Sequence, residues 1–263
     1  PPRRGVVDGT LLGKKDEILA LLREMNEDPA EYEIVDFDGP ELDAAKAAVQ
    51  LVREGKADIP MKGILQTSSF AKAILNRETG LIPASGRRLV SQCGIFEYEG
   101  RFVMITDAAI NIAPDVETQI GIVENALPVA RALGIDCPKV AVLSAVENVT
   151  DKMPSTVSAK EIAERGVEGC VISGPLALDG AISMESVKHK AIHDPVAGQA
   201  DILLVPFIEI GNVLYKACTY IAGKTMASTI CGASCPVIIT SRADTPDSKY
   251  YSILLAVLRC LKA

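Results

Sequence analysis

Short apolar runs alternate along the chain with longer segments in which apolar and charged positions are mixed. Runs that are rich in β-branched residues and bounded by Gly, Pro or Asp predict strands. We expect strands at residues 33–37, 101–106, 139–144, 169–173, 201–206 and 236–241. The longer segments have helical spacing of apolar positions or are rich in Ala. We expect helices over residues 14–27, 42–54, 115–133, 158–165, 212–223 and 248–262.

The segment 115–133 shows the clearest helix signals. Pro114 precedes it, Asp115 and Glu117 fall in its first turn, and Gly134 follows its end. Pro128 inside this helix predicts a kink. The alternation of strands and helices along the chain predicts an α/β fold with mostly parallel sheets.

Composition narrows the class of protein. Hydrophobic residues make up 48% of the chain but aromatic residues only 4%, with no Trp, so the core consists of Ala, Val, Ile and Leu. Few aromatic side chains argue against surfaces that stack on bases, and a formal charge of −7 argues against nucleic acid or an anionic membrane as a partner. We find no stretch of about eighteen uncharged apolar residues and therefore expect a soluble, cytoplasmic protein.

The cysteines and histidines do not have the spacing of a metal site. Cys231 and Cys235 lack a second Cys pair and a nearby His, so we expect reduced thiols rather than bound zinc. His189 and His193 are four residues apart, but Asp194 and the proline after it end any helix there. The sequence therefore predicts no metal site.

Four loops combine polar or glycine residues with a preceding apolar segment, and two of them carry a lysine. Lys62 stands beside a glycine that allows close approach to a phosphate, and Thr67 follows; a surface lysine at a turn is the alternative interpretation. In the segment 206–216, Asn212 opens the predicted helix and Lys216 lies on the same helical face, which suits a polar ligand. An ordinary capped helix with a solvated lysine is the alternative there.

The other two loops follow predicted strands at residues 169–173 and 236–241. In the segment 173–179, Asp179 caps the next helix or faces a cleft, and capping is the favoured interpretation. Thr240, Ser241 and Arg242 place a hydroxyl and a fixed positive charge where a strand ends and a helix begins. Sheets of this class bind ligands at that edge, and a guanidinium beside helix amides suits a phosphate. We therefore expect one shared cleft for a phosphate-bearing small molecule.

Several common nucleotide and hydrolase motifs are missing from the sequence. There is no Gly-x-Gly-x-x-Gly after a strand, no Walker A loop and no Gly-x-Ser-x-Gly turn.

Seven ordered segments together resemble the phosphate acetyl/butyryltransferase family, and most closely its phosphate butyryltransferase branch. The matching residues lie at 55–58 with 61–63, 106–108, 152–156, 174–179, 200–202, 211–216 and 240–244. The resemblance implies the reversible reaction of acyl-CoA with phosphate to give acyl phosphate and free CoA, without a metal or a bound cofactor. It also implies a homodimer and a butyryl or branched short-chain acyl group.

The resemblance further implies two α/β/α domains with the active site in the cleft between them. Residues 1–86 and 236–263 would form the first domain, and residues 87–235 the second. In the family a further strand and helix precede the segment that matches Gly5.

Roles for the site residues also follow from the resemblance. Arg242 suits the phosphate because its guanidinium binds two oxygens, and Ser241 donates to the developing oxyanion or orients the phosphate. In acetyltransferase relatives an Asp seven residues after the Ser is the proposed base for the thiol, but Ser248 stands there in this chain. Asp247 or Asp244 takes that role, or the thiol ionises without a dedicated base; our candidate is Asp247.

Lys72 is a further candidate for substrate binding, and two alternative functions remain open. Lys72 aligns with the basic residue that meets the CoA 3′-phosphate in acetyltransferases. A non-catalytic protein that binds CoA or acyl phosphate is the main alternative function. A decarboxylating dehydrogenase of the same architecture would need a carboxylate cluster for a metal and a nicotinamide site, and we identify neither in the sequence.

Overall fold

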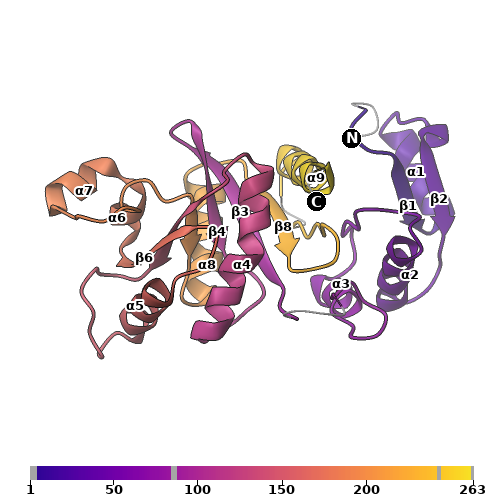
Figure 1. The fold of residues 1–263 in the computed structure, drawn as a ribbon. Helices are drawn as coiled ribbons and strands as arrows, with labels where there is room; N and C mark the ends of the chain where they lie inside the picture. The colour runs from indigo at the N-terminus through magenta and orange to yellow at the C-terminus, as the bar shows by residue number, and fades with distance from the viewer. Residues whose placement is uncertain (1–4, 84–87, 242–243, 262–263) are drawn as a thin grey trace.

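The computed structural model describes residues 5–83, 88–241 and 244–261. It has a mixed α/β fold built on a six-stranded sheet with the order β6-β5-β7-β4-β3-β8 (Figure 1). The strands are β3 (Ser91–Tyr98), β4 (Arg101–Thr106), β5 (Lys139–Leu143), β6 (Val171–Leu176), β7 (Ile202–Leu204) and β8 (Ala227–Cys231). Strands β4, β7, β5 and β6 run parallel, whereas β3 is antiparallel to both β4 and β8.

Both faces of this sheet are buried, which is why its strands are apolar at consecutive positions. Met104 faces a cluster under α4 (Val116–Ala132) and α5 (Pro154–Arg165). Its neighbours Val103 and Ile105 face the opposite cluster. That side is covered by α6 (Leu178–Ile182), α7 (Met184–Lys190) and α8 (Ile208–Lys216).

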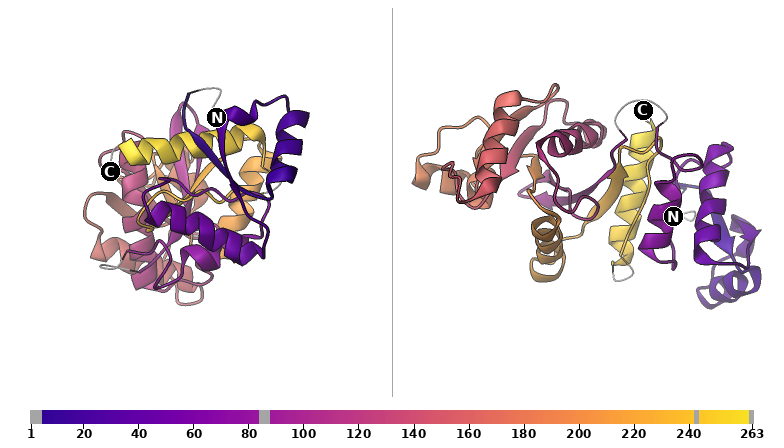
Figure 2. Two further views of the ribbon diagram at one scale, coloured as in Figure 1. Left: turned by 90° about the vertical axis from the view of Figure 1, so that its right-hand side faces the viewer. Right: turned by 90° about the horizontal axis from the view of Figure 1, so that it is seen from below.

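The N-terminal elements form a separate group at one end of the molecule (Figures 1 and 2). They are β1 (Gly9–Gly13), α1 (Lys15–Glu24), η2 (Pro29–Glu31), β2 (Tyr32–Asp36), α2 (Glu41–Arg53) and α3 (Thr67–Ile74). β1 and β2 make a parallel pair. Helices α2 and α3 share a buried cluster with Val90, Ile230 and Val237.

The C-terminal helix α9 (Pro246–Leu261) lies between the N-terminal elements and the large sheet, and it packs on β8 and α4 (Figure 2). The division into residues 1–86 plus 236–263 and 87–235 stays a prediction. Among the described residues, no helix is both long and apolar enough to cross a membrane.

Most predicted elements correspond to elements of the structure. The strands at 33–37, 101–106, 139–144, 169–173 and 201–206 appear as β2, β4, β5, β6 and β7, and the six predicted helices as α1, α2, α4, α5, α8 and α9. α4 runs as a single helix through Pro128. β1, β3, β8, α3, α6 and α7 were not predicted.

Two predictions were wrong, one helix boundary and one strand. The helix expected at 212–223 begins at Ile208, so Asn212 lies inside α8 and does not open it; a π-helical turn, η3 (Ala217–Ile221), follows. The strand expected at 236–241 is not a regular strand. Val237 and Ile238 make only isolated bridges, Val237 to Ile230 and Ile238 to Met61.

Candidate functional site

The segment that precedes Ser241 is held between two other parts of the chain. Val237 bridges to Ile230 of β8, and Ile238 bridges in parallel to Met61. The N–H of Lys62 donates to the carbonyl of Ile238 at 3.0 Å. Because the two segments run in the same direction, the turn after Lys62 and the residues after Ile238 leave the pair at the same end.

Lys62 is buried, with 4% of its surface exposed. Its Nζ donates to the carbonyl oxygens of Gly63 and Leu65, both at 3.2 Å, so the ammonium lies against its own turn. Thr67 begins α3 and Lys72 lies in its last turn, and both are exposed. The structure therefore places these three predicted residues in one turn and the helix that follows it.

Two hydrogen bonds join Ser241 to Asp244. The N–H of Ser241 donates to Asp244 Oδ2 at 2.7 Å, and the N–H of Asp244 donates to the Ser241 carbonyl at 3.2 Å. Arg242 lies outside the described residues. Asp247 is exposed in the first turn of α9, whereas Ser248 is buried, with 3% of its surface exposed.

Tyr215 connects α8 to the Ser241 segment. Its ring lies over Gly94 of β3, where a Cβ would come within 2.5 Å of ring carbons. Burial first, then the charge of Asp244, raise the pKa of Tyr215 well above its ordinary value, and a hydrogen bond with Ser228 opposes the shift. Ser228 Oγ donates to the carbonyl of Ile239 at 3.2 Å. A neutral phenol on α8 therefore lies over β3, and the charge of Asp244 acts on it.

The start of α8 packs directly on the loop that follows β4. Asp107 is buried there, and its carboxylate accepts hydrogen bonds from four backbone N–H groups. Asn212 Nδ2 donates to the carbonyl of Ala108 at 3.3 Å. Lys216, one turn further along α8, is exposed. Asn212 is thus tied to the backbone of this loop, and Lys216 faces solvent.

Two of the four predicted loops are brought together by these contacts. The bridge from Met61 to Ile238 joins the first and fourth, and the charge of Asp244 acts on the pKa of Tyr215 in the third. The loop at 173–179 lies elsewhere.

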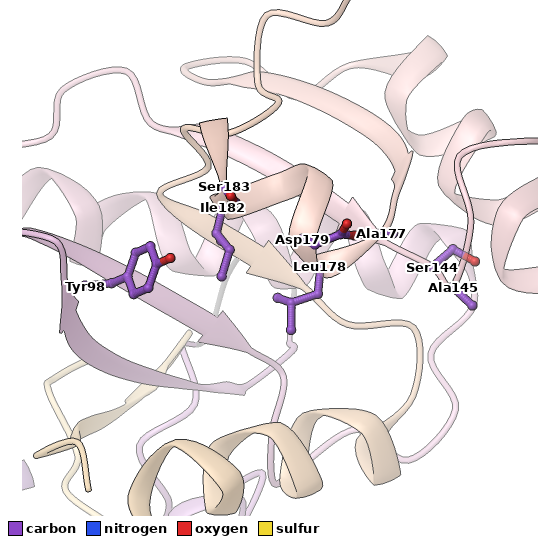
Figure 3. A pocket seen from close by; sticks show the side chains of 8 residues that line it. All are labelled: Tyr98, Ser144, Ala145, Ala177, Leu178, Asp179, Ile182 and Ser183. Atoms are coloured by element: carbon purple, nitrogen blue, oxygen red, sulfur yellow. The ribbon is translucent and has the colours of Figure 1, made fainter. Parts of the chain in front are cut away.

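Asp179 does not cap a helix. The N-cap of α6 is Ala177, which makes no side-chain cap bond, and Asp179 pairs with Lys190 at 3.0 Å. Lys190 also pairs with Glu147, which favours this arrangement over capping. Asp179 lines an open hollow of about 600 Å³ at the carboxyl ends of β5 and β6, together with Leu178, Ile182, Tyr98 and others (Figure 3). Apart from Asp179, none of the candidate residues that the structure describes lines this hollow.

Sequence reasoning missed Tyr215, Ser228 and Asp107 as parts of this region. Tyr215 lies within the segment 211–216 and Asp107 within 106–108, both of which carry the family resemblance. The sequence could therefore have pointed to these two residues, but it gave no indication of which residues they contact. Ser228 had no signal, because β8 was not predicted. Within the described ranges, no group of three or more His, Cys, Asp or Glu side chains is placed to hold a metal ion.

Comparison with known proteins gives one family for nearly the whole chain. Residues 4–257 match the family described as phosphate acetyl/butaryl transferase. A phosphate butyryltransferase of Clostridium acetobutylicum is 43% identical over 97% of this chain and 86% of that protein. A phosphate acetyltransferase of Thermotoga maritima is 38% identical over 97% of this chain and 87% of that protein.

A solved structure has the same fold. The crystal structure of a branched-chain phosphotransacylase from Enterococcus faecalis superposes with a TM-score of 0.83. The two chains are 37% identical, and the match covers 96% of this chain and 99% of the other.

Replacing Gly211 with alanine tests the packing of α8 on the loop after β4. The added Cβ would lie 2.6 Å from the carbonyl oxygen of Asp107 and 2.9 Å from the Cα of Ala108, so backbone must move. We expect Gly211→Ala to lower the free energy of unfolding by about 1–3 kcal/mol in denaturant titrations.

Gly180→Ala is the matched control, because its Cβ would meet only the ends of the Ile192 and Glu147 side chains, at 3.0 and 3.1 Å. We expect it to change stability by less than about 1 kcal/mol. Equal stability of the two variants would contradict the close approach at Gly211.

Proposed function

This chain belongs to the phosphate acetyl/butaryl transferase family, and we propose that it catalyses the reversible reaction of an acyl-CoA with phosphate to give an acyl phosphate and CoA. It is an acyltransferase, as its relatives are. We propose a butyryl or branched short-chain acyl group, because the relatives include a phosphate butyryltransferase and a branched-chain phosphotransacylase.

The parallel bridge from Met61 to Ile238 is the observation that carries the proposed site. It brings the turn with Lys62 and the residues Thr240 and Ser241 to one end of two paired segments. Lys62 and the hydroxyl-bearing residues Thr240 and Ser241, from distant parts of the sequence, support this end of the pair as the position for the phosphate.

The chemistry proposed for Ser241 and Arg242 follows from where charge develops. When a CoA thiolate attacks the acyl carbonyl of an acyl phosphate, negative charge grows on the carbonyl oxygen and on the departing phosphate. Arg242 binds two phosphate oxygens and keeps its charge near neutral pH, while Ser241 donates a hydrogen bond to the oxyanion or the phosphate.

The thiol needs help to ionise, because the pKa of a free thiol is about 8.5. We propose Asp247 as the base, since its carboxylate is exposed at the start of α9. Ser248 is buried and its backbone carbonyl accepts from Ser252 Oγ at 2.8 Å, which suits a structural role.

The remaining proposed contacts are with substrate. We assign Lys62 and Thr67 to phosphate groups, Lys72 to the 3′-phosphate of CoA, and Asn212 and Lys216 to polar groups of the substrate from the α8 side. The reaction moves an acyl group without oxidation or reduction, so we propose CoA as a substrate and no bound cofactor or metal. We propose a cytoplasmic enzyme, and its acidic composition argues against nucleic acid or an anionic membrane as a partner.

We propose a homodimer, supported by an apolar surface on α8 and η3. Val213, Tyr220 and Ile221 are 67%, 62% and 87% exposed there. Two copies of one such surface can cover each other. Light scattering is expected to give twice the monomer mass, and a monomer mass at micromolar concentration would contradict the dimer.

Thioester formation from CoA tests the reaction and the acyl group together. With a metal chelator present, we expect turnover with butyryl phosphate and acetyl phosphate. We expect kcat/KM to be higher for butyryl phosphate by about 10-fold or more, since one methylene in an apolar pocket changes the ratio by roughly 10- to 200-fold.

A preference for acetyl phosphate would contradict the proposed acyl group. If folded protein binds CoA but turns over neither substrate, the chain is the non-catalytic binding protein that is the alternative function.

Replacing Arg242 tests its place in the mechanism. We expect Arg242→Ala to lower kcat/KM by about 100- to 1000-fold, because a charge aimed at the developing anion is lost. Arg242→Lys is expected to recover only part of the rate, since an ammonium does not form the two-oxygen contact. Circular dichroism checks that both variants fold, and near-normal turnover of folded Arg242→Ala would remove Arg242 from the mechanism.

A further inference from the structure

The carboxylate nearest to the Ser241 backbone is that of Asp244. Its Oδ2 accepts the Ser241 N–H at 2.7 Å, a short distance typical of hydrogen bonds to an ionised acceptor. The N–H of Asp244 donates in return to the Ser241 carbonyl at 3.2 Å. Ser241 is therefore fixed at both its N–H and its carbonyl by the same residue.

After burial, which is the larger cause, the charge of Asp244 also raises the pKa of Tyr215 in α8. Ser228 Oγ of β8 donates to the carbonyl of Ile239 at 3.2 Å. The backbone is thus restrained by β8 two residues before Ser241, and by Asp244 at Ser241 itself.

Ser228 is itself held from the opposite side by α9. Its N–H donates to Ser252 Oγ at 2.9 Å, and Ser252 Oγ donates to the carbonyl of Ser248 at 2.8 Å. Ser228 and Ser252 are buried, with 2% and 1% of their surface exposed. The restraint on Ile239 therefore rests on a part of the protein that has little freedom to move.

We propose that Asp244 is a positioning residue for Ser241, which rests on the proposed function. Its carboxylate holds the Ser241 backbone so that the hydroxyl keeps one direction relative to the substrate. Asp247, which is exposed in the first turn of α9, keeps the proposed role of base. An acceptor oxygen is what the positioning role requires, and an amide oxygen supplies it as well as a carboxylate does.

The test compares Asp244→Asn with Asp244→Ala. The readouts are kcat and the KM values for CoA and butyryl phosphate, measured from pH 6 to 9. We expect Asp244→Ala to lower kcat by about 10- to 100-fold, because small misplacements of a reacting group cost about that much, while KM for CoA changes less than about twofold. We expect Asp244→Asn to restore kcat to within about threefold of the parent protein, with the same pH profile.

Asp247→Asn is the matched control, because it removes a carboxylate three residues away without touching the Ser241 turn. We expect it to remove the acidic limb of the pH profile, which Asp244→Asn leaves in place. If Asp244→Asn is as slow as Asp244→Ala and itself loses the acidic limb, Asp244 is the base and the positioning role is wrong. Parent-like kcat in Asp244→Ala would equally overturn it.

The experiment also distinguishes a variant that fails to fold, and a parent protein that has no activity, from failure of the proposed role of Asp244. Should Asp244→Ala fail to fold, the comparison of Asp244→Asn with the parent protein still decides between positioning and base. The parent protein is measured first: absence of turnover there overturns the proposed function, whereas turnover in the parent with no difference among the variants overturns only the role of Asp244.

Discussion

The site depends on one short extended segment that is held on both sides. Val237 bonds to β8 on one side, and Ile238 bonds to the strand-like residues around Met61 on the other. Because these contacts are made by backbone groups, they fix direction as well as position. The turn that carries Lys62 and the turn that carries Ser241 face one region for this reason, although 179 residues separate them in the sequence (241 − 62).

The six-stranded sheet supplies the rigid support behind that segment. Both of its faces are covered, so β4 and β8 have little freedom to shift. The buried Asp107 holds the loop after β4 with its carboxylate, and α8 packs on this loop at Gly211. Tyr215 thereby lies over β3 on a helix whose start is fixed.

The repeating apolar runs predicted the parallel part of the sheet, because β4, β5 and β7 are buried on both faces and read as continuous apolar segments. β3 begins with Ser91 and Gln92 and was missed, since these polar residues are buried and the backbone of Gln92 bonds to the side chains of Thr106 and Asp107. The β-branched run at 236–241 predicted a strand, but a strand needs neighbours along its length and this run has one bridge on each side. Besides burial, the pKa of Tyr215 depends on Asp244 and Ser228, which lie in distant segments of the sequence, and no local pattern reports such an effect.

The protein is an acyltransferase that moves an acyl group between a thiol and phosphate. The most direct measurement follows inorganic phosphate and butyryl-CoA by ³¹P NMR in the presence of the purified protein. The account predicts that an acyl phosphate resonance appears as phosphate is consumed, with one free thiol released for each acyl phosphate formed. Release of thiol without an acyl phosphate resonance, or no change in either signal, would contradict it.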